Sequence, residues 1–314
     1  MERADQPRQR ACKVGVVLPT IEGTMARATP RWADIMAMGQ RAEALGFDSL
    51  WVADHFFYRL PRRDRPQGVW ECWSLLAALA AVTSRVELGP LVSCTGFRNP
   101  ALMAKTAETV DEISGGRLIL GLGAGWNEYE YRAYGYPYDH RASRFEEAIT
   151  IIHGLLREGH VDFVGQYAEA RDCDLYPRGP RPAGPPIMIG TSGPRMLRLM
   201  ARFGDMWNAW HRPLDAIPAL NAEIDAACRE VGRDPATLAR TAAVRVNLLG
   251  RTGMQGAAVP PLGGAPEEIA AGLHAFAREG ISHIQIIPDP STLAGIEALG
   301  PVLDAFDQVA GAVS

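Results

Sequence analysis

Five short stretches of the sequence carry residue types that move protons or bind ligands. Each ends or directly follows an apolar run: Asp54-His55, Ser93-Cys94-Thr95, Gly125-Trp126-Asn127, Gly190 to Gly193, and Trp210-His211. Such apolar runs are typical of strands that are buried on both faces of a parallel sheet. Because the carboxyl ends of these strands lie on one side of the fold, we expect the five stretches to surround one site.

His55 is the residue best suited to acid–base chemistry, because an imidazole exchanges protons near neutral pH. It could act as a general acid or base, or donate a hydrogen bond to a ring nitrogen of a ligand. Asp54 precedes it and is the second catalytic candidate. The sequence leaves one alternative open, a structural histidine that caps a loop and is held by Asp54.

Other chemistries are disfavoured. No general base is adjacent to Cys94, so a buried structural thiol is favoured over a nucleophile. Ser74 and Ser192 lack the context of a nucleophile elbow, and a hydrolase triad is not supported. His153 and His160 have no metal-ligand spacing, so we expect no metal site.

The segment Gly190 to Arg195 reads GTSGPR and lies between an expected strand and an expected helix. Backbone N–H groups at a helix N-terminus, the hydroxyls of Thr191 and Ser192, and permissive glycines would form a pocket for an anion, above all phosphate. The alternative is a plain helix cap, with Ser192 or Gly193 as N-cap and Pro194 as the first helical residue. A position in the later half of a barrel favours phosphate.

The stretch from Arg117 to Tyr138 reads RLILGLGAGWNEYEYRAYGYPY. Its strand loses its side chains at Gly121, Gly123 and Gly125, which lets a flat ligand or another backbone come close. The alternative is a glycine-rich strand end that is packed tightly in a barrel. The spacing G-x-G-x-G is not the dinucleotide-binding G-x-G-x-x-G, and no apolar-striped helix follows, so a Rossmann site is disfavoured.

Eight apolar runs alternate with helical patterns, which predicts a single α/β domain, a (β/α)8 barrel of the TIM type. A doubly wound sheet is the alternative. Residues 124–185 are expected as an insertion after strand 4, with a helix near 143–157 and a hairpin around Gly165-Gln166. Pro301 should split the last helix, 293–309. Residues 1–12 are expected as a flexible tail, and 13–314 as the barrel domain.

Composition excludes several classes of protein. The chain of 314 residues has a formal net charge of −4, which argues against nucleic acid as a partner. Its five cysteines include no C-x-x-C pair, so neither a disulfide framework nor a zinc site is indicated. The polar N-terminus has no apolar core of a signal peptide, and the longest apolar run, 75–82, is too short for a membrane span. We expect a soluble, cytoplasmic protein.

Several segments together resemble the bacterial luciferase-like monooxygenase family. They are DSLWVADHF (48–56), RNPALMAKTAETVDEISGGRLILGLGAGWNEYEYRAYGYP (98–137), IMIGTSGPRMLRLMARFGDMWN (187–208) and the tail ISHIQIIPD. The resemblance covers nearly the whole chain from residue 13. It implies a TIM-like barrel with an insertion that binds reduced FMN or the deazaflavin coenzyme F-420 (F420).

Site residues follow from this resemblance by position. The end of the third strand, Ser93 to Thr95, would form a bulge against the flavin, with a non-prolyl cis peptide at Ser93-Cys94. Asn127 would reach the flavin ring, while Tyr131 and Thr191 to Gly193 would hold the phosphate. His55 would lie near the reactive face of the cofactor, where it acts as acid or base in some deazaflavin dehydrogenases.

The resemblance implies an oxidoreductase that transfers a hydride between F-420 and a small organic substrate, and it favours F-420 over FMN. One alternative is a monooxygenase that uses reduced FMN and O2 and needs a separate flavin reductase. Another is a non-catalytic flavin-binding protein on the same barrel. Family analogy also implies a homo-oligomer. Trp126 stands where deazaflavin sugar-phosphate dehydrogenases carry an acidic residue, which argues against sugar phosphates as substrates.

Overall fold

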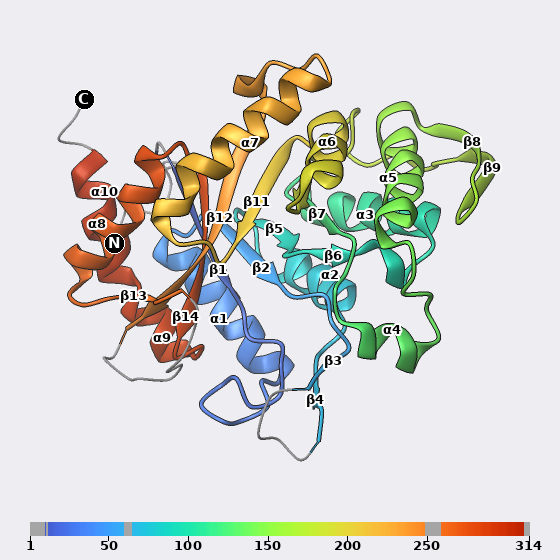
Figure 1. The fold of residues 1–314 in the computed structure, drawn as a ribbon. Coiled ribbons are helices and arrows are strands. Elements are labelled where there is room, and N and C mark those ends of the chain that lie inside the picture. The colour runs from blue at the N-terminus through green and yellow to red at the C-terminus, as the bar shows by residue number, and fades with distance from the viewer. Residues whose placement is uncertain (1–9, 11, 60–64, 249–258, 311–314) are drawn as a thin grey trace.

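The computed structural model describes residues 10, 12–59, 65–248 and 259–310, and it is a parallel barrel ringed by helices (Figure 1). Eight strands of the described residues form the barrel wall: β1 (Lys13–Val17), β2 (Ser49–Val52), β5 (Glu87–Pro90), β7 (Leu120–Gly123), β10 (Ile187–Gly190), β11 (Met206–Trp210), β12 (Ala239–Asn247) and β14 (His283–Asp289). All pairings between them are parallel, in the order β5-β2-β1-β14-β12-β11-β10-β7. The predicted (β/α)8 fold is confirmed.

The third strand of the barrel is built in two parts, and this closes the wall. Its first part, β5, pairs with β2, and its second part, β6 (Ser93–Cys94), pairs with β7. A further parallel bridge joins Leu88 to Leu118. The chain therefore shifts its pairing from one neighbouring strand to the other over a few residues, directly beside the expected site.

Helices follow the strands as predicted and form the outer layer (Figure 1). They are α1 (Trp32–Leu45), α2 (Cys72–Val82), α3 (Pro100–Ser114), α4 (Glu128–Tyr134), α5 (Arg141–Glu158), α6 (Pro194–Phe203), α7 (Ile217–Glu230), α8 (Pro266–Arg278), α9 (Leu293–Ala298) and α10 (Gly300–Ala310). The last helix is split between α9 and α10, next to Pro301, as predicted. Short 3-10 helices cover 95–97, 214–216 and 235–237.

Only part of residues 124–185 forms the insertion that was expected there. α5 packs between α3 and α6, so it is the barrel's own helix after the fourth strand. The hairpin of β8 (His160–Val164) and β9 (Glu169–Asp174) lies where a hairpin was expected. α4 was missed, because its aromatic sequence carries no apolar stripe. Three short strands complete the fold: β3 (Phe57–Tyr58), β4 (Gln67–Gly68) and β13 (Leu262–Gly263).

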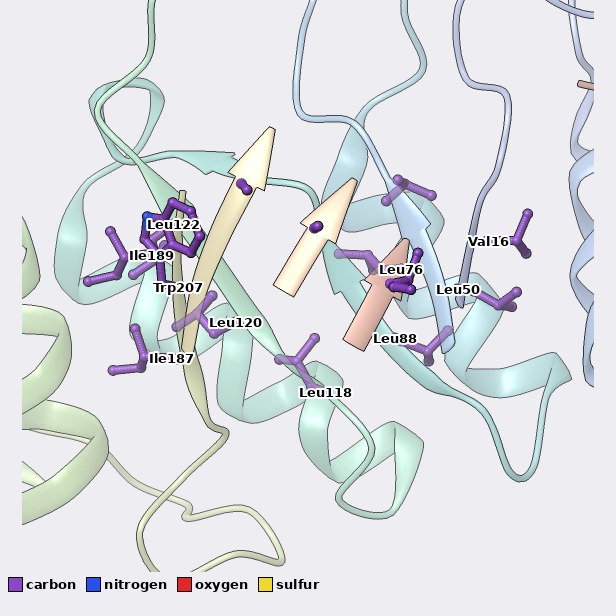
Figure 2. Packing of buried hydrophobic residues seen from close by; sticks show 14 of the residues in the cluster. Val16, Leu50, Leu76, Leu88, Leu118, Leu120, Leu122, Ile187, Ile189 and Trp207 are labelled. Carbon is purple, nitrogen blue, oxygen red and sulfur yellow. The ribbon is translucent and has the colours of Figure 1, made fainter. Parts of the chain in front are cut away.

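The main hydrophobic core lies between the barrel wall and the helices. Alternate strand residues point outward into it, including Leu50, Leu88, Leu120 and Ile189, and α2 contributes Leu76 (Figure 2). All of these side chains are fully buried. This layer explains why the strands read as continuous apolar runs, since a parallel strand covered by helices is buried on both faces.

The barrel interior is partly polar. The Trp51 indole donates to Ser49 Oγ at 2.7 Å, and Ser49 Oγ lies 2.7 Å from His283 Nε2. Asn208 donates to Gln285 Oε1 at 3.0 Å. These hydrogen bonds lower the free-energy cost of burying polar side chains, although Nδ1 of His283 and Nε2 of Gln285 have no hydrogen-bond partner among the described residues.

Arg10 fastens the chain to the base of the barrel. Its guanidinium donates to Asp48 at 2.8 Å and to Asp307 of α10 at 2.5 Å, and Cys12 is buried. At residues 10 and 12 the expected tail, 1–12, is therefore packed against the fold, while its other residues lie outside the described ones. Within the described chain, every helix is too short or too polar to cross a bilayer.

We predict that His283 makes the fold sensitive to acid. Burial, aided by the charge of Lys13, lowers the pKa of His283 from 6.5 to about 3. The unfolded chain takes up this proton below pH 6.5 and the folded chain does not, so the folded state loses stability as the pH falls from 6.5 towards 3. Between pH 6.5 and 5 the loss is about 2 kcal/mol of unfolding free energy.

Urea unfolding of the wild type and of His283→Gln at pH 6.5 and pH 5, followed by tryptophan fluorescence, measures this contribution. The variant should lose about 2 kcal/mol less than the wild type between the two pH values. Identical losses in both proteins would contradict the assignment, whatever the absolute stability of the variant.

Candidate active site

A cavity of about 660 Å³ lies at the carboxyl ends of the strands, where the sequence predicts the site. Predicted site residues that line it are Asp54, His55, Cys94, Gly125, Gly190, Thr191 and Ser192. Its wall also includes Trp126, Trp207 and Trp210, together with Arg141 at the start of α5 and Arg212. Its size is within the usual range for cofactor and substrate sites in proteins.

Glycines of the fourth strand let the cavity floor pack closely. A Cβ atom on Gly125 would lie 2.3 Å from Tyr131 Oη and 2.6 Å from Cys94 Sγ, and the residue has φ +73°. A Cβ atom on Gly123 would lie 2.8 Å from Val92. The missing side chains therefore allow tight packing, as the alternative for this motif supposed, and both glycines also line the cavity.

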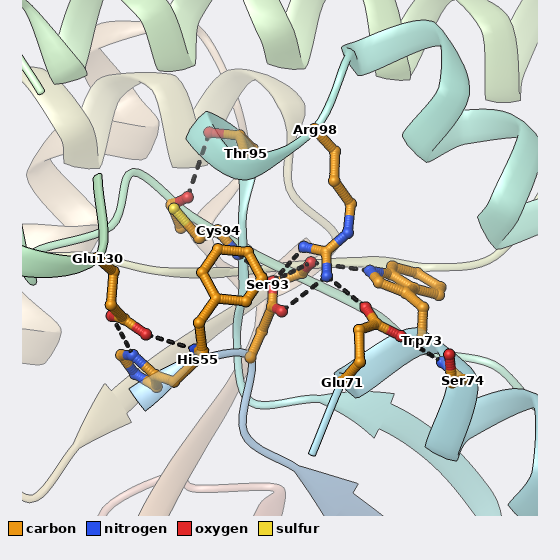
Figure 3. A network of polar contacts seen from close by, with 12 residues as sticks. His55, Glu71, Trp73, Ser74, Ser93, Cys94, Thr95, Arg98 and Glu130 are labelled. Atoms are coloured by element: carbon orange, nitrogen blue, oxygen red, sulfur yellow. Dashed lines mark hydrogen bonds and ion pairs between the residues drawn. The ribbon is translucent and has the colours of Figure 1, made fainter. Parts of the chain in front are cut away.

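Asp54 is the centre of a buried polar network, and Figure 3 labels its partners Arg98, Ser93 and Cys94. Its carboxylate accepts from both Nη atoms of Arg98, at 2.6 and 2.9 Å, from Ser93 Oγ at 2.8 Å and from the Cys94 N–H at 2.9 Å. Arg98 also donates to Glu71 at 2.6 Å, and Glu71 caps α2 by accepting from the Ser74 N–H. Burial opposes the charge of Arg98, but the charge of Asp54 and the hydrogen bonds to Asp54 and Glu71 together outweigh it and raise the pKa of Arg98.

His55 is held by Glu130, not by Asp54 as the structural alternative supposed. Its Nδ1 lies 2.7 Å from Oε2 of Glu130, whose side chain is fully buried (Figure 3). The other oxygen of Glu130 accepts from the backbone N–H of Phe56 at 2.5 Å and of Phe57 at 3.2 Å. Asp54 and His55 are neighbours in sequence, yet they belong to different polar networks.

The bulge at the third strand differs from the expectation in one respect. The non-prolyl cis peptide joins Leu91 to Val92, so its expected place at Ser93-Cys94 was wrong. Ser93 is buried and accepts from the Trp73 indole at 3.1 Å, while Thr95 donates to the Gly123 carbonyl at 3.2 Å. These contacts join the bulge to the second helix and the fourth strand.

Cys94 is the residue of the bulge that reaches the cavity. Its Sγ lies 3.0 Å from Tyr131 Oη, and Tyr131 donates to the Ala124 carbonyl at 2.9 Å. Burial raises the pKa of the Cys94 thiol to about 12. The thiol is therefore protonated at neutral pH, which agrees with a structural role rather than a nucleophilic one.

Five predicted residues support the cavity without lining it: Ser93, Thr95, Asn127, Tyr131 and Gly193. Asn127 is buried, and its amide donates to the Phe57 carbonyl at 3.2 Å. Tyr131 is buried beneath Gly125 and Cys94. Thr95 and Tyr131 hold backbone that does line the cavity, by donating to the carbonyls of Gly123 and Ala124.

The expected anion pocket lies at the N-terminus of α6. Gly193 is the N-cap, with φ +86°, and Pro194 is the first helical residue, as the cap alternative supposed. Gly190, Thr191 and Ser192 nevertheless line the cavity, and the N-cap glycine has no side chain that could accept from the first N–H groups of the helix. The first turn of α6 therefore faces a cavity that also holds two arginines, Arg141 and Arg212.

Sequence reasoning missed Glu130, Arg98 and Arg141. Glu130 belongs to α4, which was not predicted. Arg98 directly precedes Asn99, the predicted cap of α3, and no role was predicted for Arg98 itself. The sequence does carry a signal for this helix, 128–134. Asn127 is of a residue type favoured just before a helix, and Gly135 is of one favoured just after it. Within the described residues, no group of three or more His, Cys, Asp or Glu side chains is arranged to hold a metal ion.

Residues 12–249 match the family described as luciferase-like monooxygenase. An F420-dependent glucose-6-phosphate dehydrogenase from Amycolatopsis mediterranei is 36% identical over 178 residues, covering 55% of this chain and 51% of the relative. A 5,10-methylenetetrahydromethanopterin reductase from Archaeoglobus fulgidus is 34% identical over 194 residues, covering 61% and 53%. This chain thus spans about half the length of the curated relatives it matches.

Solved structures show the same fold at lower identity. An F420-dependent secondary alcohol dehydrogenase, solved with an F420-acetone adduct, is similar with a TM-score of 0.79 and 20% identity, over 95% of this chain and 99% of that one. A coenzyme F420-dependent tetrahydromethanopterin reductase from Methanopyrus kandleri has a TM-score of 0.77 and 18% identity, over 95% and 100%.

We predict that Asp54→Asn destabilises the protein by about 3 kcal/mol, because it leaves the buried Arg98 charge with only Glu71 as partner. Glu169→Gln, which removes one partner of the exposed pair with Arg171, is the matched control and should cost less than about 1 kcal/mol. Urea unfolding of both variants measures the difference. Equal, small effects would show that the Asp54–Arg98 pair does not hold the site together.

Proposed function

Because this chain belongs to the luciferase-like monooxygenase family, we propose that it is an F420-dependent oxidoreductase that transfers a hydride to or from a small organic substrate. The curated relatives named above are F420-dependent enzymes or a pterin reductase, which favours the deazaflavin over FMN. The observation that carries the proposal is the cavity itself, with His55 on its wall, a glycine floor and the start of α6 at one side.

The residues of the cavity fit a flat cofactor with a phosphate-bearing tail. Val92, Cys94 and Gly125 leave an open floor on which a tricyclic ring could rest. The first turn of α6, with Thr191 and Ser192, would hold the phosphate, because free backbone N–H groups there favour anions. When bound, the deazaflavin would supply the hydride chemistry of the reaction.

The protein's own contribution is to place groups around the cofactor and to handle protons. We propose His55 as the catalytic acid or base, since its ring lines the cavity and its Nδ1 is held by a hydrogen bond to Glu130. Asp54, expected as catalytic, is proposed instead as a positioning residue, because both of its oxygens are bound by Arg98. Trp126 lines the cavity where the resemblance places an acidic residue in sugar-phosphate dehydrogenases, so a sugar phosphate is not the substrate that we propose.

Three further expectations stay with this proposal. A homo-oligomeric state rests on family analogy, and a cytoplasmic location on five free cysteines. A separate reductase that regenerates the reduced cofactor would be a partner of the enzyme. The oligomeric state can be measured by light scattering of the purified protein.

Titration with F420 and with FMN, each oxidised and reduced, tests the proposed function. Trp126, Trp207 and Trp210 line the cavity, so tryptophan fluorescence should report binding directly. We expect micromolar or tighter binding of F420 and weak binding of FMN. The reverse preference, above all for reduced FMN, would overturn the proposal in favour of a monooxygenase with a flavin reductase. Stoichiometric binding without turnover of any substrate would favour a flavin-binding protein.

The anion pocket yields a separate prediction. Ser192→Ala should weaken F420 binding about tenfold, because it removes a hydrogen bond to a charged phosphate. A phosphate-free fragment of the cofactor, the deazaflavin with its ribityl chain alone, should bind wild type and variant equally. Equal loss for both ligands would show that Ser192 acts on the ring or on the fold, and not on the phosphate.

A further inference from the structure

We propose that Glu130 is a positioning residue that keeps the proton of neutral His55 on Nδ1 and so leaves Nε2 free to exchange protons in the cavity. The role of Nε2 towards a substrate rests on the proposed function. The position of the proton on the ring does not, because it follows from contacts within the protein. Neither residue type alone suggested this pairing, since the two lie 75 positions apart in the chain.

The hydrogen bonds of Glu130 identify the donor in this pair. One oxygen accepts from two backbone N–H groups, those of Phe56 and Phe57, and these can only donate. Both oxygens of a carboxylate accept hydrogen bonds, and neither can donate one. An ionised carboxylate has no proton to give, so the 2.7 Å contact requires an Nδ1–H that donates to Oε2. Neutral His55 then carries a lone pair on Nε2.

The ring of His55 is also prevented from turning over. Tyr58 lies against one side of it, with ring centroids 4.3 Å apart, and Trp126 meets it edge-on at 5.7 Å. Its side chain is 15% exposed, and the ring faces the cavity. Nε2 makes no hydrogen bond to any residue in the part of the chain that the structure describes, so it is available to a ligand.

The carboxylate is fixed to the same loop that carries the histidine. Glu130 binds the two residues that follow His55, while Phe56 stacks on Tyr134 of α4 with ring centroids 4.0 Å apart. Asn127 adds a hydrogen bond from the start of α4 to the Phe57 carbonyl. The position of Glu130 relative to His55 is therefore set by three separate contacts between α4 and the loop after β2.

This arrangement gives His55 a defined part in the proposed reaction. During oxidation of an alcohol, the hydroxyl proton would pass to Nε2, the O–H electron pair would form the carbonyl bond, and the C–H bond of the same carbon would break as its hydride passes to the cofactor. During reduction, Nε2–H would return the proton to the carbonyl oxygen. In both directions the Glu130 carboxylate balances the charge of the imidazolium, as a buried carboxylate does for the histidine of a catalytic triad.

Nitrogen-15 NMR of protein labelled at histidine tests the proposal without cofactor or substrate. The two ring nitrogens of a neutral histidine differ strongly in chemical shift according to which one carries the proton. His55→Asn, which lacks the signal, assigns it. In the wild type we expect the proton on Nδ1 in nearly all molecules. A wild-type His55 with its proton on Nε2 would overturn the proposal, and this measurement needs no variant of Glu130.

Glu130→Gln gives the sharper outcome. Its remaining oxygen can still accept from Phe56 and Phe57, and its amide then faces Nδ1 as a donor. We therefore expect the proton of His55 to move to Nε2 in this variant. Glu130→Asp keeps the carboxylate and should retain the wild-type form. Glu128→Gln, at an exposed position of the same helix, is the control and should change nothing.

An unchanged His55 tautomer in Glu130→Gln would show that Glu130 only supports the loop. The outcome is independent of the cofactor titration. If F420 fails to bind while the tautomer moves as expected, the proposed function falls and the pairing stands. If F420 binds and the tautomer does not move, the reverse holds.

Discussion

The site depends on one buried carboxylate. Asp54 follows the second strand with its side chain only 1% exposed, and an unpaired negative charge there would cost several kcal/mol. The protein meets this cost with four hydrogen bonds, which come from the third strand and from Arg98. Each donor is thereby drawn to a fixed position, so the bulge that brings Cys94 to the cavity floor is set by the need to neutralise Asp54.

Much of the fold was predictable because its signals are local. Continuous apolar runs mark strands covered by helices, and Pro194, Gly46 and Asn99 mark helix ends where the structure has them. The positions of the site residues were predictable as well, because the carboxyl ends of all barrel strands lie at the same end of the barrel. His55, Cys94 and Gly125 meet at one cavity for that reason alone.

The partners of these residues were not predictable in the same way. Arg98 lies 44 positions from Asp54, and Glu130 lies 75 from His55. No sequence periodicity or fixed spacing links the two members of such a pair. Each contact depends on how segments that are far apart in the chain pack together at the carboxyl end of the barrel. Neighbouring residues on an extended chain point in opposite directions, so Asp54 and His55 could not share a partner. Because the two residues are adjacent in sequence, Asp54 was expected as the partner of His55, whereas the partner is Glu130.

The contacts between α4 and the loop after β2 have a consequence for recombination within this family. His55 lies on the loop after β2, and Glu130 lies on α4. The stacked rings of Phe56 and Tyr134 hold this loop against the helix. A chimera that takes residues 54–58 from one parent and 127–136 from another would mix surfaces shaped for different neighbours. The two segments therefore have to come from the same parent, and a single crossover belongs outside residues 54–136.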